Sequence, residues 1–281
     1  MKVSIYIPTK NRLDLLKIAV DSVLRQTYES IELIVVNDGS TDETQKYLEQ
    51  LTASDNRVKY INNAQSKGAC AARNAAIESA SGYFLTGLDD DDLFEPCHIA
   101  ALVSYWQLLE AASQKFSAIY VQDQLRNYSV INVLRKPSSV KAEDMLLSNC
   151  VGNQIFSTKE KFLSAGLFDQ NMPAWQDLEF YYRFLKIHGP ARLLDIPSYI
   201  FDVSPRGDRI SVGSKLKIVN ACESFIRKHN ISDQKIQQQL LMQVYARYYG
   251  FNVTLKDVIT VLKLGWNVKV LYRIVLRWAN R

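Results

Sequence analysis

The sequence contains few of the residues that cross-link or interrupt small folds: 281 residues include four cysteines, seven prolines and eleven glycines. The cysteines are far apart and form no Cys-x-x-Cys pair, which excludes a zinc site of the usual spacing and a disulfide framework and is typical of a reducing compartment. No segment reaches the roughly 18 uncharged apolar residues that span a membrane. The start lacks the pattern of a secretory signal, so we expect a cytoplasmic protein.

Two nucleotide-binding fingerprints are also missing. The sequence has no Gly-x-x-x-x-Gly-Lys-Ser/Thr motif and no Gly-x-Gly-x-x-Gly motif, which disfavours P-loop ATPases and Rossmann-type dehydrogenases. The Asp-x-Asp-x-Asp-Gly spacing of an EF-hand is absent as well.

The net charge of +5 is concentrated at the C-terminal end. Residues 255–281 hold six of the 34 cations and one of the 29 acids, so the preceding residues carry 28 of each sign. This balance argues against nucleic acid as a partner of the main domain. Lys269, Arg273, Arg277 and Arg281 recur every four residues and would form one stripe on a helix. A basic amphipathic helix favours peripheral association with the inner leaflet of a membrane, and the alternative is a helix packed on the domain.

Apolar, β-branched runs begin near residues 3, 31, 57 and 83, and helical patterns lie between them. This alternation predicts an α/β domain with parallel strands and right-handed crossovers. We also expect a helix over 96–112 with Pro96 in its first turn, strands near 118 and 129, a helix over 177–187 and helices from 214 onward. In parallel sheets ligands bind at the carboxyl ends of the strands, so the loops there are the ones that carry the chemistry.

Four consecutive acids, Asp89 to Asp92, directly follow the fourth predicted strand. Two unit charges about 4 Å apart repel by about 1 kcal/mol in water and about 4 kcal/mol at a partly buried site. A divalent cation that prefers oxygen ligands, Mg²⁺ or Mn²⁺, would neutralise this cluster, with phosphate and water as further ligands. The alternative is a solvated turn whose last acids cap the next helix. Asp38 and Arg73, on neighbouring loops, could hold the base and phosphate of a nucleotide.

Together the segments 4–12, 36–42, 68–74 and 88–96 resemble the family 2 glycosyltransferases with the GT-A fold, a Rossmann-like, mostly parallel sheet with flanking helices. A weaker likeness continues at 173–179, where the family commonly has Glu-Asp at the start of a helix. The resemblance implies inverting transfer of a sugar from a nucleotide diphosphate, with an Asp-x-Asp motif holding the metal.

Carried over by residue, the resemblance implies the following roles. The nucleotide-sugar would contact Pro8, Thr9, Arg12, Asp38, Arg73, Asp89 and Asp90, and the metal would bind Asp91 and Asp89. Asp177 would be the general base, since an attacking hydroxyl must lose a proton; its alternative role is to stabilise a helix N-terminus. Trp175 and Gln176 would face the acceptor, although Trp175 also suits a core. Apart from the resemblance, Arg206 and Arg209 lie in a segment that could close over the donor, and the alternative is an ordinary surface loop.

These residues predict a GT-A domain over 1–210, with a nucleotide-sugar half at 1–97 and an acceptor half at 98–210, followed by a helical region at 211–281. The expected donor is a UDP-sugar, first UDP-glucose, and the expected acceptor is a polyprenyl-diphosphate-linked intermediate of O-antigen or capsule synthesis. A β-linkage would result. The alternatives are a nucleotidyltransferase, whose glycine-rich triphosphate loop is missing after the first strand, and a non-catalytic subunit that binds sugar nucleotides.

Overall fold

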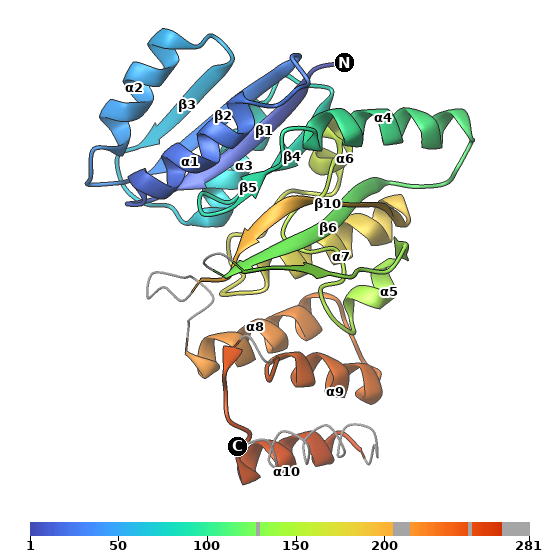
Figure 1. Ribbon diagram of the computed structural model, residues 1–281. Coiled ribbons are helices and arrows are strands. Elements are labelled where there is room, and N and C mark those ends of the chain that lie inside the picture. Colours follow the sequence, from blue (N-terminus) through green and yellow to red (C-terminus); the bar gives the residue numbers. More distant parts are fainter. Residues whose placement is uncertain (128–129, 205–213, 247–248, 266–281) are drawn as a thin grey trace.

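The computed structural model describes residues 1–127, 130–204, 214–246 and 249–265 (Figure 1). In the N-terminal half, strands and helices alternate as the sequence predicts. They are β1 Val3–Thr9, α1 Leu13–Leu24, β2 Ile31–Asp38, α2 Thr44–Ser54, β3 Val58–Asn63, α3 Ala69–Ser79 and β4 Phe84–Gly87.

These strands form the first sheet, in the order β3-β2-β1-β4-β9. The pairs β1–β2, β2–β3 and β1–β4 are parallel, and β9, Ser157–Thr158, closes the edge antiparallel to β4. The parallel arrangement follows from the helical crossovers, each of which returns the chain to the same end of the sheet. The carboxyl ends of β1, β2 and β4 therefore meet at one edge.

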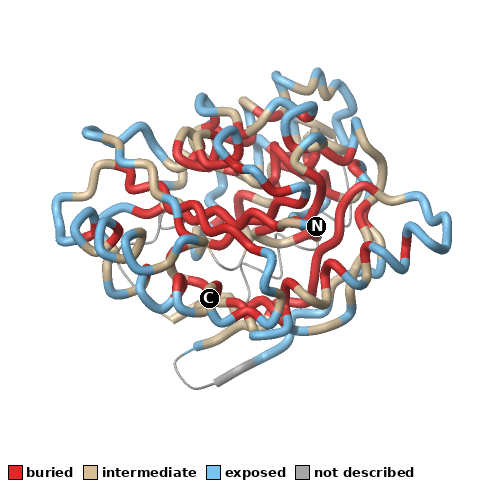
Figure 2. Tube along the Cα trace, turned by 90° about the horizontal axis from the view of Figure 1, so that it is seen from above, coloured by how far each residue is buried: buried red, intermediate tan, exposed pale blue. Residues whose placement is uncertain are grey.

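Helices cover both faces of this sheet. Alternate side chains of β1 point to opposite sides, so Val3, Ile5 and Ile7 pack in one apolar cluster with α1 and α4, while Tyr6 packs in the other with α3 and α7. This is the two-residue period of a strand buried on both faces. Figure 2 shows the buried backbone running through the middle of the molecule, with exposed turns at the periphery.

The next part of the chain builds a second sheet, in the order β5-β10-β6-β7, with β8 also paired to β10. Its strands and the helices around it are β5 Leu93–Phe94, α4 His98–Ala111, β6 Ala118–Asn127, β7 Val130–Leu134, β8 Ser139–Val140, α5 Ala142–Met145, α6 Lys159–Ser164, α7 Gln176–His188 and β10 Ala191–Asp202. The expected helix near Pro96 begins only at His98, with Cys97 as its N-cap, so this proline precedes the helix instead of occupying its first turn.

Three described helices follow: α8 Lys215–Lys228, α9 Gln234–Gln243 and α10 Leu255–Lys263. They lie beyond α5 and α7, at the end of the molecule away from β3 (Figure 1). Ile218, Ala221 and Phe225 of α8 belong to the same apolar cluster as α7, so the C-terminal helices share a core with the domain.

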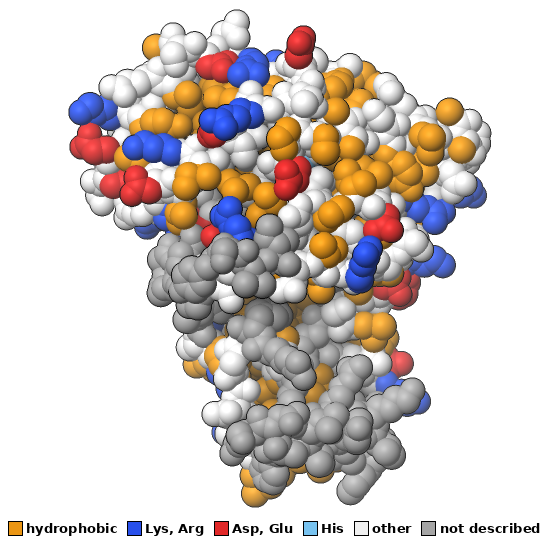
Figure 3. Space-filling view, in the orientation of Figure 1, with side chains coloured by type: hydrophobic (Ala, Val, Ile, Leu, Met, Phe, Trp, Pro, Cys, Tyr) orange, Lys and Arg blue, Asp and Glu red, His pale blue; other side chains and the backbone are white. Residues whose placement is uncertain are grey.

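The charged surface and the C-terminal region bear on the expected partners. On the face in Figure 3, side chains of both signs are interspersed over the broad upper part of the molecule. In the part of the chain that the structure describes, no helix is both long and apolar enough to cross a bilayer. The basic stripe predicted over 269–281 lies outside the described residues, as does most of the segment with Arg206 and Arg209.

Candidate active site

The loops that follow β1, β2 and β4 meet at the carboxyl edge of the first sheet. Asp38, the last residue of β2, organises the neighbouring loop between β3 and α3: its buried carboxylate accepts hydrogen bonds from the Asn63 amide, the Ser66 hydroxyl and the backbone N–H groups of Lys67 and Gly68, at 2.7–2.9 Å. Burial raises the pKa of Asp38, but these four donors lower it more, so the pKa lies below its ordinary value. Asp38 thus fixes the loop that leads into α3.

The four acids of the loop after β4 do not face the same way. Asp90 is buried and accepts from the Thr9 hydroxyl at 2.7 Å and from Arg12 Nη1 at 3.0 Å. Burial raises its pKa to about 6, although Arg12 opposes this. Sequence resemblance assigns Asp90 and Thr9 to the nucleotide, whereas here their side chains join the β1 and β4 loops to each other.

Asp92 points into the protein on the other side. It is fully buried and accepts from the Tyr199 hydroxyl at 2.7 Å, from the backbone N–H of Asp202 at 3.1 Å and from the Asn153 amide at 3.3 Å. Burial, and then the charges of Asp91 and Asp89, raise its pKa well above the ordinary value. The acidic loop is thereby attached to the end of β10.

Asp89 and Asp91 alternate with these two and keep 22% and 16% of their side chains exposed. Hydrogen-bond donors and Arg12 therefore hold the two buried acids in place, and two partly exposed carboxylates are left at the surface. Their oxygen atoms suit Mg²⁺ or Mn²⁺. Among the described residues no group of three or more His, Cys, Asp or Glu side chains is arranged to hold a metal, so a cation here would need ligands from a phosphate and water.

Arg73 lies between the acidic loop and Asp177, the residue expected to be the general base. Its guanidinium, nearly buried on α3, donates from Nη2 to Asp89 Oδ1 at 2.9 Å, and its Nη1 lies 4.0 Å from Asp177 Oδ1. Phe168 lies against the same guanidinium, with its ring centroid 5.4 Å from Cζ. Arg73 was expected to contact the nucleotide, and in the structure it lies between Asp89 and Asp177.

Asp177 lies in the first turn of α7. The preceding Trp175 has a left-handed backbone, φ +58°, and its carbonyl accepts the Glu179 N–H at 2.8 Å as the helix begins. Such a conformation is costly for a bulky residue and often occurs at functional sites. Asp177 Oδ1 is buried without a hydrogen-bond partner in the described part of the chain. Burial raises the pKa of Asp177 to about 6, Arg73 lowers it and Asp89 raises it.

The two residues expected at the acceptor are placed differently from each other. The Trp175 indole is buried, donates from Nε1 to the Tyr249 hydroxyl at 3.0 Å and packs against Phe225. This placement supports the core alternative for Trp175. Gln176 is partly exposed at the start of α7 and donates to the Met172 carbonyl at 3.3 Å.

A polar layer beneath the site was not foreseen. The Tyr6 hydroxyl donates to Gln154 Oε1 at 3.1 Å, and Gln154 Nε2 approaches Asp89 Oδ1 at 3.5 Å. Burial raises the pKa of Tyr6, which keeps it a hydroxyl donor. A Cβ at Gly87 would collide with both Tyr6 and Gln154. A glycine inside a strand signals such a close approach and is the one feature that could have revealed this layer.

A groove of about 860 Å³ lies elsewhere, between α3 and residues 165–171, with Asn63, Lys67, Glu78 and Lys228 among its lining residues. None of Asp38, Asp89, Asp91 and Asp177 lines it. We place the candidate active site at the carboxyl edge of the sheet, because the acids, the partly exposed carboxylates and the raised pKa of Asp177 are all found there.

Comparison with known proteins identifies the family. The family model described as "Glycosyl transferase family 2" matches residues 4–155. A putative colanic acid biosynthesis glycosyl transferase of Escherichia coli, WcaA, is 29% identical over 93% of both chains. A GalNAc(5)-diNAcBac-PP-undecaprenol beta-1,3-glucosyltransferase of Campylobacter jejuni is 25% identical and covers 98% of this chain and 87% of its own length.

Two solved structures share the fold. S. aureus TarS in complex with UDP-GlcNAc superimposes with a TM-score of 0.69 at 17% identity, covering 94% of this chain and 79% of its own. The mannosyltransferase PcManGT of Pyrobaculum calidifontis, in complex with GDP-Man and Mn²⁺, gives a TM-score of 0.56 at 16% identity, with 98% of this chain and 84% of its own covered.

Proposed function

This chain belongs to glycosyl transferase family 2 and has the GT-A fold, and on that premise we propose that it transfers a sugar from a UDP-sugar to a lipid-linked saccharide with inversion at the anomeric carbon. The observation that carries the proposal is the position of Arg73 between two groups of carboxylates. Partly exposed Asp89 and Asp91 lie on the donor side, and Asp177, with a raised pKa, lies on the other.

The donor is held, in this proposal, at the carboxyl edge of the first sheet. The nucleotide lies over the loop that Asp38 orders and beside Pro8, Thr9 and Arg12. Asp91 and Asp89 would hold Mn²⁺ or Mg²⁺, which when bound supplies positive charge to the diphosphate leaving group. Asp90 is buried under Thr9 and Arg12 and holds the loop after β1 in a fixed position relative to the acidic loop after β4.

The chemical step is assigned to Asp177. Its carboxylate accepts the proton of the acceptor hydroxyl as the oxygen attacks the anomeric carbon, and the bond to the diphosphate breaks on the opposite face. A pKa near 6 makes the group a stronger base than an ordinary aspartate while leaving it ionised at neutral pH. A single displacement on an α-linked donor yields a β-linkage.

The donor and the acceptor are proposed from the relatives. One relative of 33% identity, which covers 53% of this chain and 56% of its own length, is named UDP-Glc:alpha-D-GlcNAc-diphosphoundecaprenol beta-1,3-glucosyltransferase WfgD. With the undecaprenol-linked relative above, it supports UDP-glucose as the first donor to test and an intermediate of O-antigen or capsule synthesis as acceptor. Such an acceptor places the protein at the cytoplasmic face of the inner membrane, bound through its basic C-terminal residues.

The domain organisation expected from the sequence is kept as part of the proposal. In this proposal residues 1–97 are the nucleotide-sugar half, residues 98–210 are the acceptor half, and residues 211–281 are the part that associates with the membrane. Exposed Leu255 and Ile259 on α10 are compatible with such a surface.

Nucleotide release from a panel of donors tests the proposal. Purified protein with Mn²⁺ is incubated with UDP-, GDP- and dTDP-sugars, with and without undecaprenyl-diphosphate-linked saccharide. We expect acceptor-dependent release from one UDP-sugar, and its loss in the Asp177→Asn variant. The matched control is Asp21→Asn, an exposed side chain on helix α1, and this variant should behave as the unmodified protein. Acceptor-dependent release by Asp177→Asn at the normal rate would overturn the assignment of the base.

A further inference from the structure

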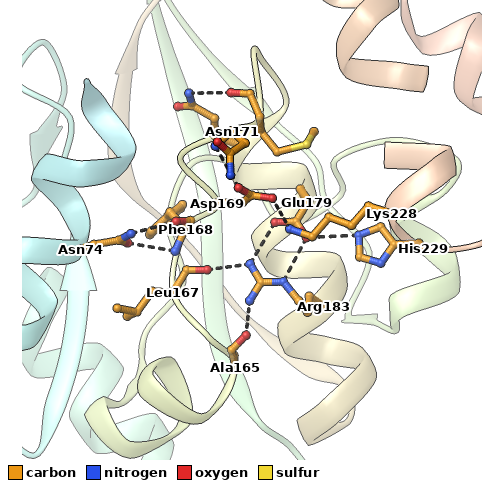
Figure 4. A network of polar contacts seen from close by, with 12 residues as sticks. Asn74, Ala165, Leu167, Phe168, Asp169, Asn171, Glu179, Arg183, Lys228 and His229 are labelled. Atoms are coloured by element: carbon orange, nitrogen blue, oxygen red, sulfur yellow. Dashed lines mark hydrogen bonds and ion pairs between the residues drawn. The ribbon is translucent and has the colours of Figure 1, made fainter. Parts of the chain in front are cut away.

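A buried charge network outside the acidic loop begins at Glu179, two residues after the proposed base on α7 (Figure 4). Glu179 is fully buried, and its carboxylate accepts from Arg183 Nε at 3.0 Å and from Arg183 Nη2 at 2.9 Å. Burial raises the pKa of Glu179, but hydrogen bonds from His229 and Arg183 lower it by more. The pKa of Glu179 therefore lies below its ordinary value, and the carboxylate stays ionised. Charge-assisted, bidentate bonds of this kind fix the orientation of a guanidinium.

Arg183 also holds the loop before α7 by hydrogen bonds to its backbone. Its other N–H groups donate to the carbonyl of Ala165 and, at 2.6 Å, to the carbonyl of Leu167. Gly166 and Leu167 both have left-handed backbones, with φ +84° and +58°. Glycine adopts this conformation without cost, but in Leu167 it persists only where the surroundings hold the residue, and Arg183 supplies that restraint through the Leu167 carbonyl.

The loop is held from α3 as well. The side-chain amide of Asn74 donates to the Phe168 carbonyl at 2.8 Å and accepts from the Phe168 N–H at 2.9 Å. The neighbouring residue on α3 is Arg73, whose guanidinium lies against the Phe168 ring. The ring face is therefore positioned by Asn74 on one side and by the Glu179–Arg183 pair on the other, as Figure 4 shows for the polar contacts.

We propose, resting on the function proposed above, that Glu179, Arg183 and Phe168 are positioning residues that hold the Arg73 guanidinium between Asp89 and Asp177. The ring face attracts the cation and blocks its retreat into the core. Arg73 Nε has no hydrogen-bond partner among the described residues, so its place depends on Asp89, Asp177 and this ring. The network thus controls how closely the Arg73 guanidinium approaches Asp89 on one side and Asp177 on the other.

The C-terminal helices take part in the same network. Lys228 and His229, at the end of α8, reach Glu179 Oε1 at 3.0 and 3.1 Å. Lys228 also pairs with Asp169 of the loop. Through Glu179 the helical region therefore braces the α7 segment that carries Asp177.

Substitution of Phe168 tests the proposal. Phe168→Met keeps apolar volume without a ring face, and Phe168→Tyr restores the ring. The matched control is Phe162→Met, which removes an equally buried ring that packs on Phe180 and Phe184. The readouts are the pH profile of kcat and, with no donor present, the carboxyl titration of Asp177 followed by NMR.

We expect Phe168→Met to move the Asp177 titration and the acidic limb of kcat upward by about half a unit to one unit, because a retreating cation stabilises the carboxylate less. The groups that face Asp177 are Arg73, Asp89, Tyr6, Tyr181 and Cys70, and the substitution leaves each of them in the sequence. Phe168→Tyr and Phe162→Met should keep the original midpoint.

The outcomes separate the two proposals. An unchanged Asp177 midpoint in folded Phe168→Met, or an equal shift in Phe162→Met, would overturn the positioning role even if the unmodified protein transfers sugar. If Phe168→Met does not fold, Phe168→Leu is measured in its place against the same standard. Absence of transfer by the unmodified protein would refute the proposed function, while the NMR titration would still decide the positioning role.

Discussion

Replacing Asp177 with asparagine should abolish sugar transfer and, at the same time, stabilise the protein at alkaline pH. A carboxylate kept for chemistry sits in surroundings that disfavour its charge, whereas a carboxylate kept as a structural counter-ion sits in surroundings that favour it. Asp177 Oδ1 is buried without a hydrogen bond, and Arg73 approaches it only to 4.0 Å. The two roles therefore predict opposite signs for the change in stability.

The pKa of Asp177 supplies the magnitude. Burial raises it from 3.8 to about 6, and a shift of about two units corresponds to about 3 kcal/mol. Because the folded-state pKa is raised, the folded protein binds the proton more tightly than the unfolded chain between these values. Stability is therefore lost as the pH rises from about 4 to about 6, and the full penalty applies above that. The neutral amide of Asp177→Asn removes this penalty, and Arg73 keeps Asp89 as its partner at 2.9 Å.

Urea unfolding at pH 8 and at pH 4 measures the effect. We expect a gain of about 1–3 kcal/mol at pH 8 that disappears at pH 4, together with a loss of transfer on the order of 100-fold to 10,000-fold, which is the usual contribution of a general base. Asp21→Asn, on the surface, should change neither quantity. A variant that is less stable than the unmodified protein at pH 8 would refute the reasoning, since Asp177 would then be a counter-ion to Arg73.

Two further predictions concern the metal and the fold. Asp91→Asn should remove the increase in UDP affinity that Mn²⁺ produces, as measured by calorimetry. Asp90→Asn should keep this increase, because the Asp90 carboxyl faces Thr9. An equal dependence of UDP affinity on Mn²⁺ in both variants would contradict the assignment of Asp91. Glu32→Gln should cost about 1–3 kcal/mol at pH 7, because hydrogen bonds from Ser4 and Ser81 outweigh burial and lower the Glu32 pKa from 4.5. That contribution is present above pH 4.5 and is lost as the pH falls, so unfolding at pH 3 should show a smaller difference.

Local patterns in the sequence were enough to predict the framework of the site. The spacing of β-branched runs and helical patterns predicted the parallel strands β1 to β4, and the placement of Asp38, Arg73 and Asp89 near one sheet edge followed from topology, although Arg73 lies on α3 and not on a loop. The family and the fold were indicated by ordered motifs and are confirmed. The position of Asp177 at the start of a helix was predicted from the residues around it.

Side-chain direction, by contrast, depended on contacts between distant segments. Asp90 and Asp92 turn inward because Thr9 and Tyr199, 81 and 107 residues away, offer them donors. Trp175 is buried because Tyr249 and the α8 helix cover it. A run of four acids carries no signal that says which of them will be buried.

The amino-acid sequence by itself determined which chemical groups are available and at which edge of the sheet they emerge, because strand and helix periodicity are local properties. The tertiary structure alone decided that Arg73 lies between Asp89 and Asp177 and that a loop held by Glu179 and Arg183 keeps it there. Burial and the distance between charges set the pKa of a base, and both exist only once separate parts of the chain have packed together.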